Sequence, residues 1–334
     1  MIGTSKEPLL AKTKARPLSW TGLWEAFVYL AAGVAFVCTT MGFLGRYWWV
    51  FDLTSHFRIQ YLALSVSIGA LCVLRRRWRL SFLFLILAIV NVLPVSPYLL
   101  RNSASNAKHP PNTIRAVLIN VHTQNRRFDR VRDFTLSTKP DFIVLEEVNS
   151  EWLQSLREIK KALPYSVEAA REDNFGIVLL SRHPLINSEV IHLGGAEVPS
   201  VLARIDVRGT VLTVLGTHPL PPGGREYSQL RKEQLAAIAD FLNRQKGSKV
   251  LLGDLNTTPW NHYFRQLVEG TGLTDSARGF GLQPTWPTSV TVLRIPIDHC
   301  LLSPDLKAVE RTIGPNVGSD HFPLIVDFVA QPAN

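Results

Sequence analysis

The first hundred residues contain three long apolar runs, at residues 26–45, 59–74 and 80–100, and the first of them carries no charged side chain. About 20 apolar residues are enough for a helix to cross the hydrocarbon core of a bilayer. A buried core helix is the alternative for any one run, but three in succession, with the Trp48-Trp49 pair at a plausible interface, favour membrane spans. We therefore predict three transmembrane helices within residues 26–100. No small-residue cleavage site separates the first run from the others, which argues against a cleaved signal peptide.

The hydrophobic pattern changes after residue 100. Residues 101–112 are polar, include two prolines and are typical of a linker. From residue 113 to residue 334, short apolar runs of strand length alternate with amphipathic helical patterns, such as the long one at residues 225–244. Several strands follow one another in mid-chain. This favours an α/β domain of sheets packed together with helices outside, rather than a doubly wound parallel sheet.

Charge adds an orientation to this picture. The chain has net charge +9; four lysines and arginines precede the first run, and four arginines lie within residues 75–79. The loop between the first two runs has only Arg46 and Arg58. Because Lys and Arg collect on the cytoplasmic side, we predict a cytoplasmic basic N-terminus at residues 1–25. Three spans then give a multi-pass protein of the plasma (inner) membrane with an extracytoplasmic domain. The basic clusters are thus topology signals rather than a nucleic-acid patch.

Polar residues stand where the predicted strands of this domain end. Asp254 and Asn256 follow the apolar run at residues 250–252, and the strand period of two puts them on the same side. The others are Asn120, Glu146 with Glu147, His218, and Asp320 with His321, while Asp298 lies within another predicted strand, at residues 295–302. Each alone is an ordinary cap or turn residue. Together, acids, amides and histidines at successive strand ends predict one catalytic rim.

The segments that carry these residues resemble the endonuclease/exonuclease/phosphatase superfamily, which has the fold of DNase I. The resemblance covers roughly residues 113–330 and rests on seven motifs in family order. They are Ile119-Asn120, the run ending at Glu147-Val148, the run from Phe175 to Leu185, Thr217-His218-Pro219, Gly253-Asp254-Leu255-Asn256, Ile297-Asp298-His299 and Ser319-Asp320-His321-Phe322-Pro323. The resemblance implies a four-layer α/β/β/α sandwich built from two packed mixed β-sheets. One departure is Glu146, where the family often has Gln.

The resemblance also implies roles for these residues in a metal-dependent phosphohydrolase. Glu147 would ligate Mg²⁺ or Mn²⁺, with Asn120 in or near the metal's shell and Asp320 completing the metal side. Asp254 would orient and deprotonate the attacking water. Asn256 and His218 would hydrogen-bond the phosphoryl oxygens, and His321 would face the phosphate, paired with Asp298. Oxygen ligands of this kind suit hard divalent cations, and a neighbouring carboxylate favours the charged form of a histidine.

The fold does not indicate which phosphate ester is the substrate. The predicted membrane topology, however, distinguishes between the candidate substrates. A domain outside the membrane on three spans meets lipid headgroups rather than cytosolic substrates. The arrangement is similar to that of VanJ-type bacterial membrane proteins, which act on undecaprenyl pyrophosphate. We therefore expect the bilayer and a lipid-linked phosphate or pyrophosphate as partners. The alternatives are a membrane-tethered phosphodiesterase of sphingomyelinase type, or a nuclease with nucleic acid as its partner. A non-catalytic binding protein is disfavoured, because every expected catalytic position is filled.

Overall fold

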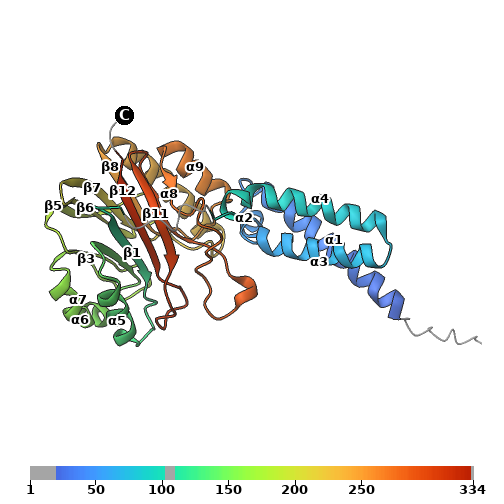
Figure 1. Ribbon diagram of the computed structural model, residues 1–334, viewed down its shortest axis with the longest axis horizontal. Coiled ribbons are helices and arrows are strands. Elements are labelled where there is room, and N and C mark those ends of the chain that lie inside the picture. Colours follow the sequence, from blue (N-terminus) through green and yellow to red (C-terminus); the bar gives the residue numbers. More distant parts are fainter. Residues whose placement is uncertain (1–19, 102–109, 332–334) are drawn as a thin grey trace, which may run out of the picture.

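The structure is a computed structural model and describes residues 20–101 and 110–331. Its N-terminal part, here called the helical region, consists of α1 (Trp20–Phe43), α2 (Trp49–Ser55), α3 (Arg58–Leu74) and α4 (Trp78–Val95), followed by the short turn η1 (Ser96–Tyr98). Helices α1, α3 and α4 lie alongside one another and extend away from the sheets, and α2 lies between them and the rest of the chain (Figure 1). Many apolar side chains on the outside of this region are exposed, among them Leu30, Phe82 and Leu93. Apolar surface of this extent indicates that something other than water covers it.

Two segments of the described chain are long and apolar enough to cross a membrane, Gly22–Phe43 and Trp78–Tyr98. The apolar run at residues 59–74 falls in α3, which has only 17 residues. It is bent by 59° relative to α2, and the pair makes a third span only if counted as one broken helix. Two of the three predicted spans therefore coincide with helices of sufficient length and apolar character, and the third does so only when combined with α2. The first also begins earlier than predicted, at Trp20, while residues 1–19 and 102–109 of the predicted N-terminus and linker lie outside the described residues.

The remaining chain forms two six-stranded sheets. The order of the first is β11 (Leu306–Ile313), β12 (Leu324–Ala330), β1 (Ile114–Asn120), β2 (Phe142–Glu146), β4 (Ile177–Ser181) and β3 (Tyr165–Ala169). The order of the second is β5 (Leu185–His192), β6 (Pro199–Val207), β7 (Thr210–Thr217), β8 (Ser248–Asp254), β10 (Asp298–Leu302) and β9 (Thr274–Asp275). Each sheet has one parallel pair, β1 with β2 and β7 with β8, among antiparallel ones. Both sheets are therefore mixed, as predicted.

Alternation along the strands explains how the sheets stack. In β1, Ala116 and Leu118 point into a core shared by both sheets, whereas Val117 and Ile119 point to the opposite side. That outer side is covered by α5 (Phe128–Thr138), α6 (Ser150–Ser155) and α7 (Arg157–Ala162). The outer face of the second sheet packs against α8 (Arg225–Arg244) and α9 (His262–Thr271). Because both faces of each sheet are buried, the order of layers is helix, sheet, sheet, helix (Figure 1).

The predicted elements agree with the structure where the apolar period is strong. Helix α8 has the bounds expected from its pattern, and β1 needs only one further residue, Asn120. Strands β3, β9 and β11 were not predicted. In β11 the buried Leu306 and Arg311 stand among half-exposed neighbours, so no apolar run marks the strand. Strand β10 begins at Asp298 rather than at residue 295, so Asp298 opens the strand instead of lying within it.

Candidate active site

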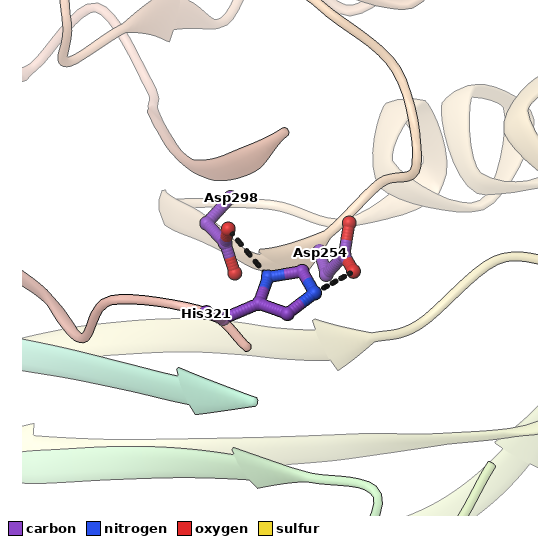
Figure 2. Close-up of side chains that lie close together, drawn as sticks. All are labelled: Asp254, Asp298 and His321. Carbon is purple, nitrogen blue, oxygen red and sulfur yellow. Dashed lines mark hydrogen bonds and ion pairs between the residues drawn. The ribbon is translucent and has the colours of Figure 1, made fainter. Parts of the chain in front are cut away.

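The pairing of β8 with β10 brings two carboxylates together. Asp298 is the direct antiparallel partner of Asp254, and the imidazole of His321, from the loop before β12, lies between them (Figure 2). His321 Nδ1 lies 2.9 Å from Asp298 Oδ2, and His321 Nε2 lies 3.6 Å from Asp254 Oδ2. Ser319 Oγ fixes the loop by donating to the main-chain oxygen of Asn120 at 2.7 Å. The loop before β12 therefore contacts both the end of β1, through Ser319, and the second sheet, through His321.

Asn256 and His218 approach the same carboxylate from another side. His218 Nε2 lies 3.6 Å from Asp254 Oδ2 and 3.3 Å from Asn256 Nδ2. The strand period predicted that Asn256 lies beside Asp254, but another feature brings them together. Strand β8 ends at Asp254, and Asn256 has φ +50, outside any strand. Its main-chain N–H donates to Asp254 Oδ1 at 2.8 Å, which closes a tight side-chain turn.

Glu146 and Glu147 point to different places although they are adjacent. Glu146 is fully buried, and both its oxygens accept from the main-chain N–H of Asp254, at 3.1 and 3.0 Å. A Cβ on Gly253 would lie 3.0 Å from Glu146 Oε1, so this glycine leaves room for the glutamate that reaches across from the first sheet. Burial, followed by the charges of Asp254 and Asp298, raises the pKa of Glu146 well above its usual range. Glu146 thus links the two sheets through the main chain of Asp254, and its raised pKa disfavours an extra negative charge in the site.

Glu147 is held by a different set of groups. Its Oε1 accepts from Asn120 Nδ2 at 2.9 Å, and its Oε2 accepts from the main-chain N–H of Thr123 at 3.1 Å. His122 Nδ1 lies 3.0 Å from Asp320 Oδ1 and 4.0 Å from Glu147 Oε2, so that it bridges the two predicted metal ligands. The other oxygen of Asp320 accepts from Trp286 Nε1 at 3.0 Å. His122, Glu147 and Asn256 all have positive φ, a strained backbone that also occurs at turns elsewhere in the chain and that here falls on three residues of one site.

The donor set around Glu147 fits a hard divalent cation. Glu147 and Asp320 offer carboxylate oxygens on one side of the site, each already oriented by a neighbouring N–H donor. Asn120 orients Glu147, because its amide nitrogen faces Glu147 and its carbonyl oxygen accepts from the main-chain N–H of His122 at 3.0 Å. Another group, Asp254, Asp298 and His321, has donor atoms that all lie within 4.8 Å of one another. There His321 is already paired with Asp298, which favours a proton-handling role over metal ligation.

Electrostatics assign different protonation states to the two histidines. Burial lowers the pKa of His321, but the carboxylates of Asp298 and Asp254 outweigh it and raise the pKa to about 10. His321 is therefore an imidazolium at neutral pH. The pKa of His218 is lowered, chiefly by burial, so this ring is neutral. Burial raises the pKa of Asp254 to about 8, with Asp298 adding to the rise and His321 opposing it. A carboxylate with that pKa is a stronger base than an ordinary aspartate.

A cavity of about 650 Å³ opens onto these groups. Six of the eight predicted site residues line it, namely Glu147, His218, Asp254, Asn256, Asp320 and His321. Asn120 and Asp298 lie behind them and contact Glu147 and His321. The structure thus brings all eight predicted residues to one place.

Residues that were not predicted from the sequence also contribute to the site, among them five from three separate segments of the chain. His122 stands two positions after Asn120, and only its spacing from a motif residue could have drawn attention to it. Trp286 lies in a Pro-Thr-Trp-Pro segment that matches no strand or helix pattern. Leu53, His56 and Phe57 line the cavity from the helical region, more than 60 residues before the first predicted site residue. These three residues lie between the first and second apolar runs, and no motif there indicates that they belong to an active site.

A two-sheet sandwich with paired Asp and His at the strand ends defines the class of DNase I-like phosphoester hydrolases. The family model described as "Endonuclease/Exonuclease/phosphatase family" matches residues 117–321, and the chain belongs to that family. No curated protein sequence matches the chain significantly.

Solved structures share the fold at low identity. Humanized D. rerio TDP2 is 17% identical with a TM-score of 0.55, over 66% of this chain and 100% of that one. The human Nocturnin catalytic domain with bound sulfate is 18% identical with a TM-score of 0.55, over 67% of this chain and 97% of that one. The Bacteroides thetaiotaomicron mannosyl-6-phosphatase is 18% identical with a TM-score of 0.51, over 65% of this chain and 99% of that one.

Proposed function

We propose that this protein is a Mg²⁺- or Mn²⁺-dependent phosphohydrolase that acts at a membrane surface on a lipid-linked phosphate or pyrophosphate such as undecaprenyl pyrophosphate. The observation that carries the proposal is the presence, in one chain, of an Asp254–His321–Asp298 site and of two helices apolar enough to cross a membrane. Helices of this kind hold the site beside lipid headgroups.

The arrangement of the helical region supports a multi-pass orientation. Glu25 near the start of α1 forms an ion pair with Arg77, between α3 and α4, so the start of α1 lies at the same end as the basic cluster at residues 75–79. The sheets lie at the other end (Figure 1). With 17 residues, α3 is about 25 Å long, close to the thickness of the hydrocarbon core. Counted with α2 as one broken span, it makes three, with the arginines cytoplasmic and the catalytic domain extracytoplasmic.

The chemistry follows from the residues that line the cavity. Asp254 accepts the proton of an attacking water while that water adds to phosphorus and the ester or anhydride oxygen leaves. The imidazolium of His321 and the amide of Asn256 donate hydrogen bonds to the phosphoryl oxygens, whose charge grows in the transition state. His218, neutral and buried, holds the orientation of Asn256. A divalent cation at Glu147 and Asp320 would supply further charge neutralisation as a Lewis acid.

The proposal is tested by offering detergent-solubilised protein a panel of phosphate esters with Mg²⁺. The panel contains undecaprenyl pyrophosphate, sphingomyelin, phosphoinositides and single- and double-stranded DNA, with the Asp254→Asn variant as the blank. Release of inorganic phosphate from the pyrophosphate at a rate well above the others is expected. A preference for sphingomyelin or DNA would contradict the proposal and favour a tethered phosphodiesterase or nuclease.

A fusion reporter tests the orientation separately. A reporter placed after Asn334 is expected to behave as extracytoplasmic. A cytoplasmic signal would contradict the three-span arrangement and would remove the topological reason for a lipid substrate on the outer face.

A further inference from the structure

Part of the wall of the catalytic cavity is apolar. It includes Pro221, Pro222 and Tyr227 before and within α8, and Ile295 and Ile297 before β10. Two further side chains come from the helical region, Leu53 in α2 and Phe57 in the turn between α2 and α3. Both are only partly buried. One cavity therefore joins charged catalytic groups to apolar side chains of the helical region.

The turn that carries these two side chains is fixed to the catalytic domain by hydrogen bonds. His56 Nδ1 lies 3.1 Å from Thr258 Oγ1, and the main-chain oxygen of His56 accepts from Trp260 Nε1 at 3.2 Å. Both partners follow the Asp254–Asn256 motif. Gln60, in the first turn of α3, donates to the main-chain oxygen of Arg294 at 3.1 Å. These hydrogen bonds hold Leu53 and Phe57 in a fixed position in the cavity wall.

We propose that Leu53 and Phe57 form a subsite for the first carbons of the apolar chain attached to the scissile phosphate. This inference rests on the proposed lipid-linked substrate and assigns the residues that recognise its chain. The side chains of Leu53 and Phe57 offer apolar contacts and no hydrogen-bond partner, which suits a hydrocarbon chain better than a sugar. Both residues also belong to the helical region, whose apolar exterior is exposed. Each methylene buried in such a subsite raises affinity by roughly fourfold.

The subsite predicts a dependence on chain length that soluble isoprenyl pyrophosphates can measure. Dimethylallyl and farnesyl pyrophosphate present the same pyrophosphate on chains of five and fifteen carbons. Wild-type protein is expected to have a higher kcat/KM for the longer one. Leu53→Ala and Phe57→Ala are expected to reduce that ratio by roughly tenfold, while kcat/KM for the short substrate stays near its wild-type value and so reports an intact fold.

Matched controls come from the same region. Leu93→Ala and Phe82→Ala make the same changes at side chains that are 65% and 64% exposed and do not line the cavity. They are expected to leave the ratio unchanged. As a second variant, Leu53→Trp narrows the cavity beside this wall. It is expected to lower kcat/KM for the long substrate more than for the short one.

The outcomes separate this inference from the function it rests on. If the wild-type enzyme prefers the long substrate and the cavity variants keep that preference, or if both substrates are hydrolysed equally well, the subsite is wrong and the phosphohydrolase stands. If the wild-type enzyme hydrolyses neither pyrophosphate but does cleave another ester, the proposed function fails and the subsite fails with it.

Discussion

The carboxylate of Asp52 in α2 and the guanidinium of Arg231 in α8 form an ion pair whose side chains are 2% and 0% exposed. Arg231 also donates to the main-chain oxygen of Asn256, and Asn261 donates to the other oxygen of Asp52 at 2.6 Å. One buried arginine therefore connects the helical region to the loop that carries a predicted phosphate-binding residue. The helical region and the catalytic domain are thus connected by a buried ion pair, and residues of both line the cavity.

We expect Asp52→Ala to destabilise the protein by about 3–5 kcal/mol, because it leaves Arg231 buried without its anion. A double-mutant cycle with Arg231→Ala, followed by denaturant unfolding of the solubilised protein, measures this. The double variant should be less destabilised than the sum of the single variants by about 1–3 kcal/mol. Strictly additive losses would mean that the pair does not couple the two parts.

Glu147→Gln should raise the divalent-metal concentration needed for activity while leaving the fold intact. The amide keeps the shape of the side chain but removes the negative charge that a hard cation requires. Activity as a function of Mg²⁺ and Mn²⁺ concentration measures the shift, and Glu269→Gln, on the exposed face of α9, is the matched control. Full activity after exhaustive EDTA treatment would contradict a metal-dependent mechanism.

The catalytic half of the chain could be predicted from the sequence because its site is built from strand ends. A buried strand such as β1 or β8 is visible as an apolar run, and the polar residue that ends it is visible too. Acids, amides and histidines at successive strand ends predict one rim, which places Asn120, Glu147 and Asp254 near one another. In the structure, β1 and β2 are parallel neighbours, so their carboxyl ends lie at the same edge. The motif resemblance then adds a role for each of them.

The rest depended on contacts that leave no local pattern. Asp52 is a single acid in an apolar stretch, and its partner Arg231 lies on a helix where alternating charges are ordinary. By residue type Glu146 adds a negative charge to the site, but burial raises its pKa and its side chain turns toward the main chain of Asp254. Helix α3 by itself does not pass as a membrane span. It does so only together with α2, from which a bend of 59° separates it.

Asp254→Asn should lower kcat by about 10²–10⁴-fold and leave KM nearly unchanged, because a general base acts in the transition state rather than in substrate binding. The amide can still accept the hydrogen bond from the main-chain N–H of Asn256, so the loop should keep its shape. Steady-state kinetics on the best substrate of the panel measure both constants. Asp240→Asn, on the exposed side of α8, is the control. Near-normal turnover by the Asp254 variant would remove this residue from the mechanism.

Asp298→Asn should have a milder effect on kcat at neutral pH and should move the alkaline limit of activity. His321 donates as an imidazolium only below its pKa of about 10, and the carboxylate of Asp298 contributes to raising that pKa. Replacing the carboxylate by a neutral amide lowers the pKa of His321, so the charged donor is lost at a lower pH and the descending limb of the pH profile shifts to lower pH. The measurement is kcat/KM from about pH 6 to about pH 11 for the wild type, the variant and Asp240→Asn. This range includes the pKa of Asp254, about 8, and that of His321, about 10. A merely structural role for Asp298 would lower activity at every pH without moving the limb, and that result would separate Asp298 from the protonation state of His321.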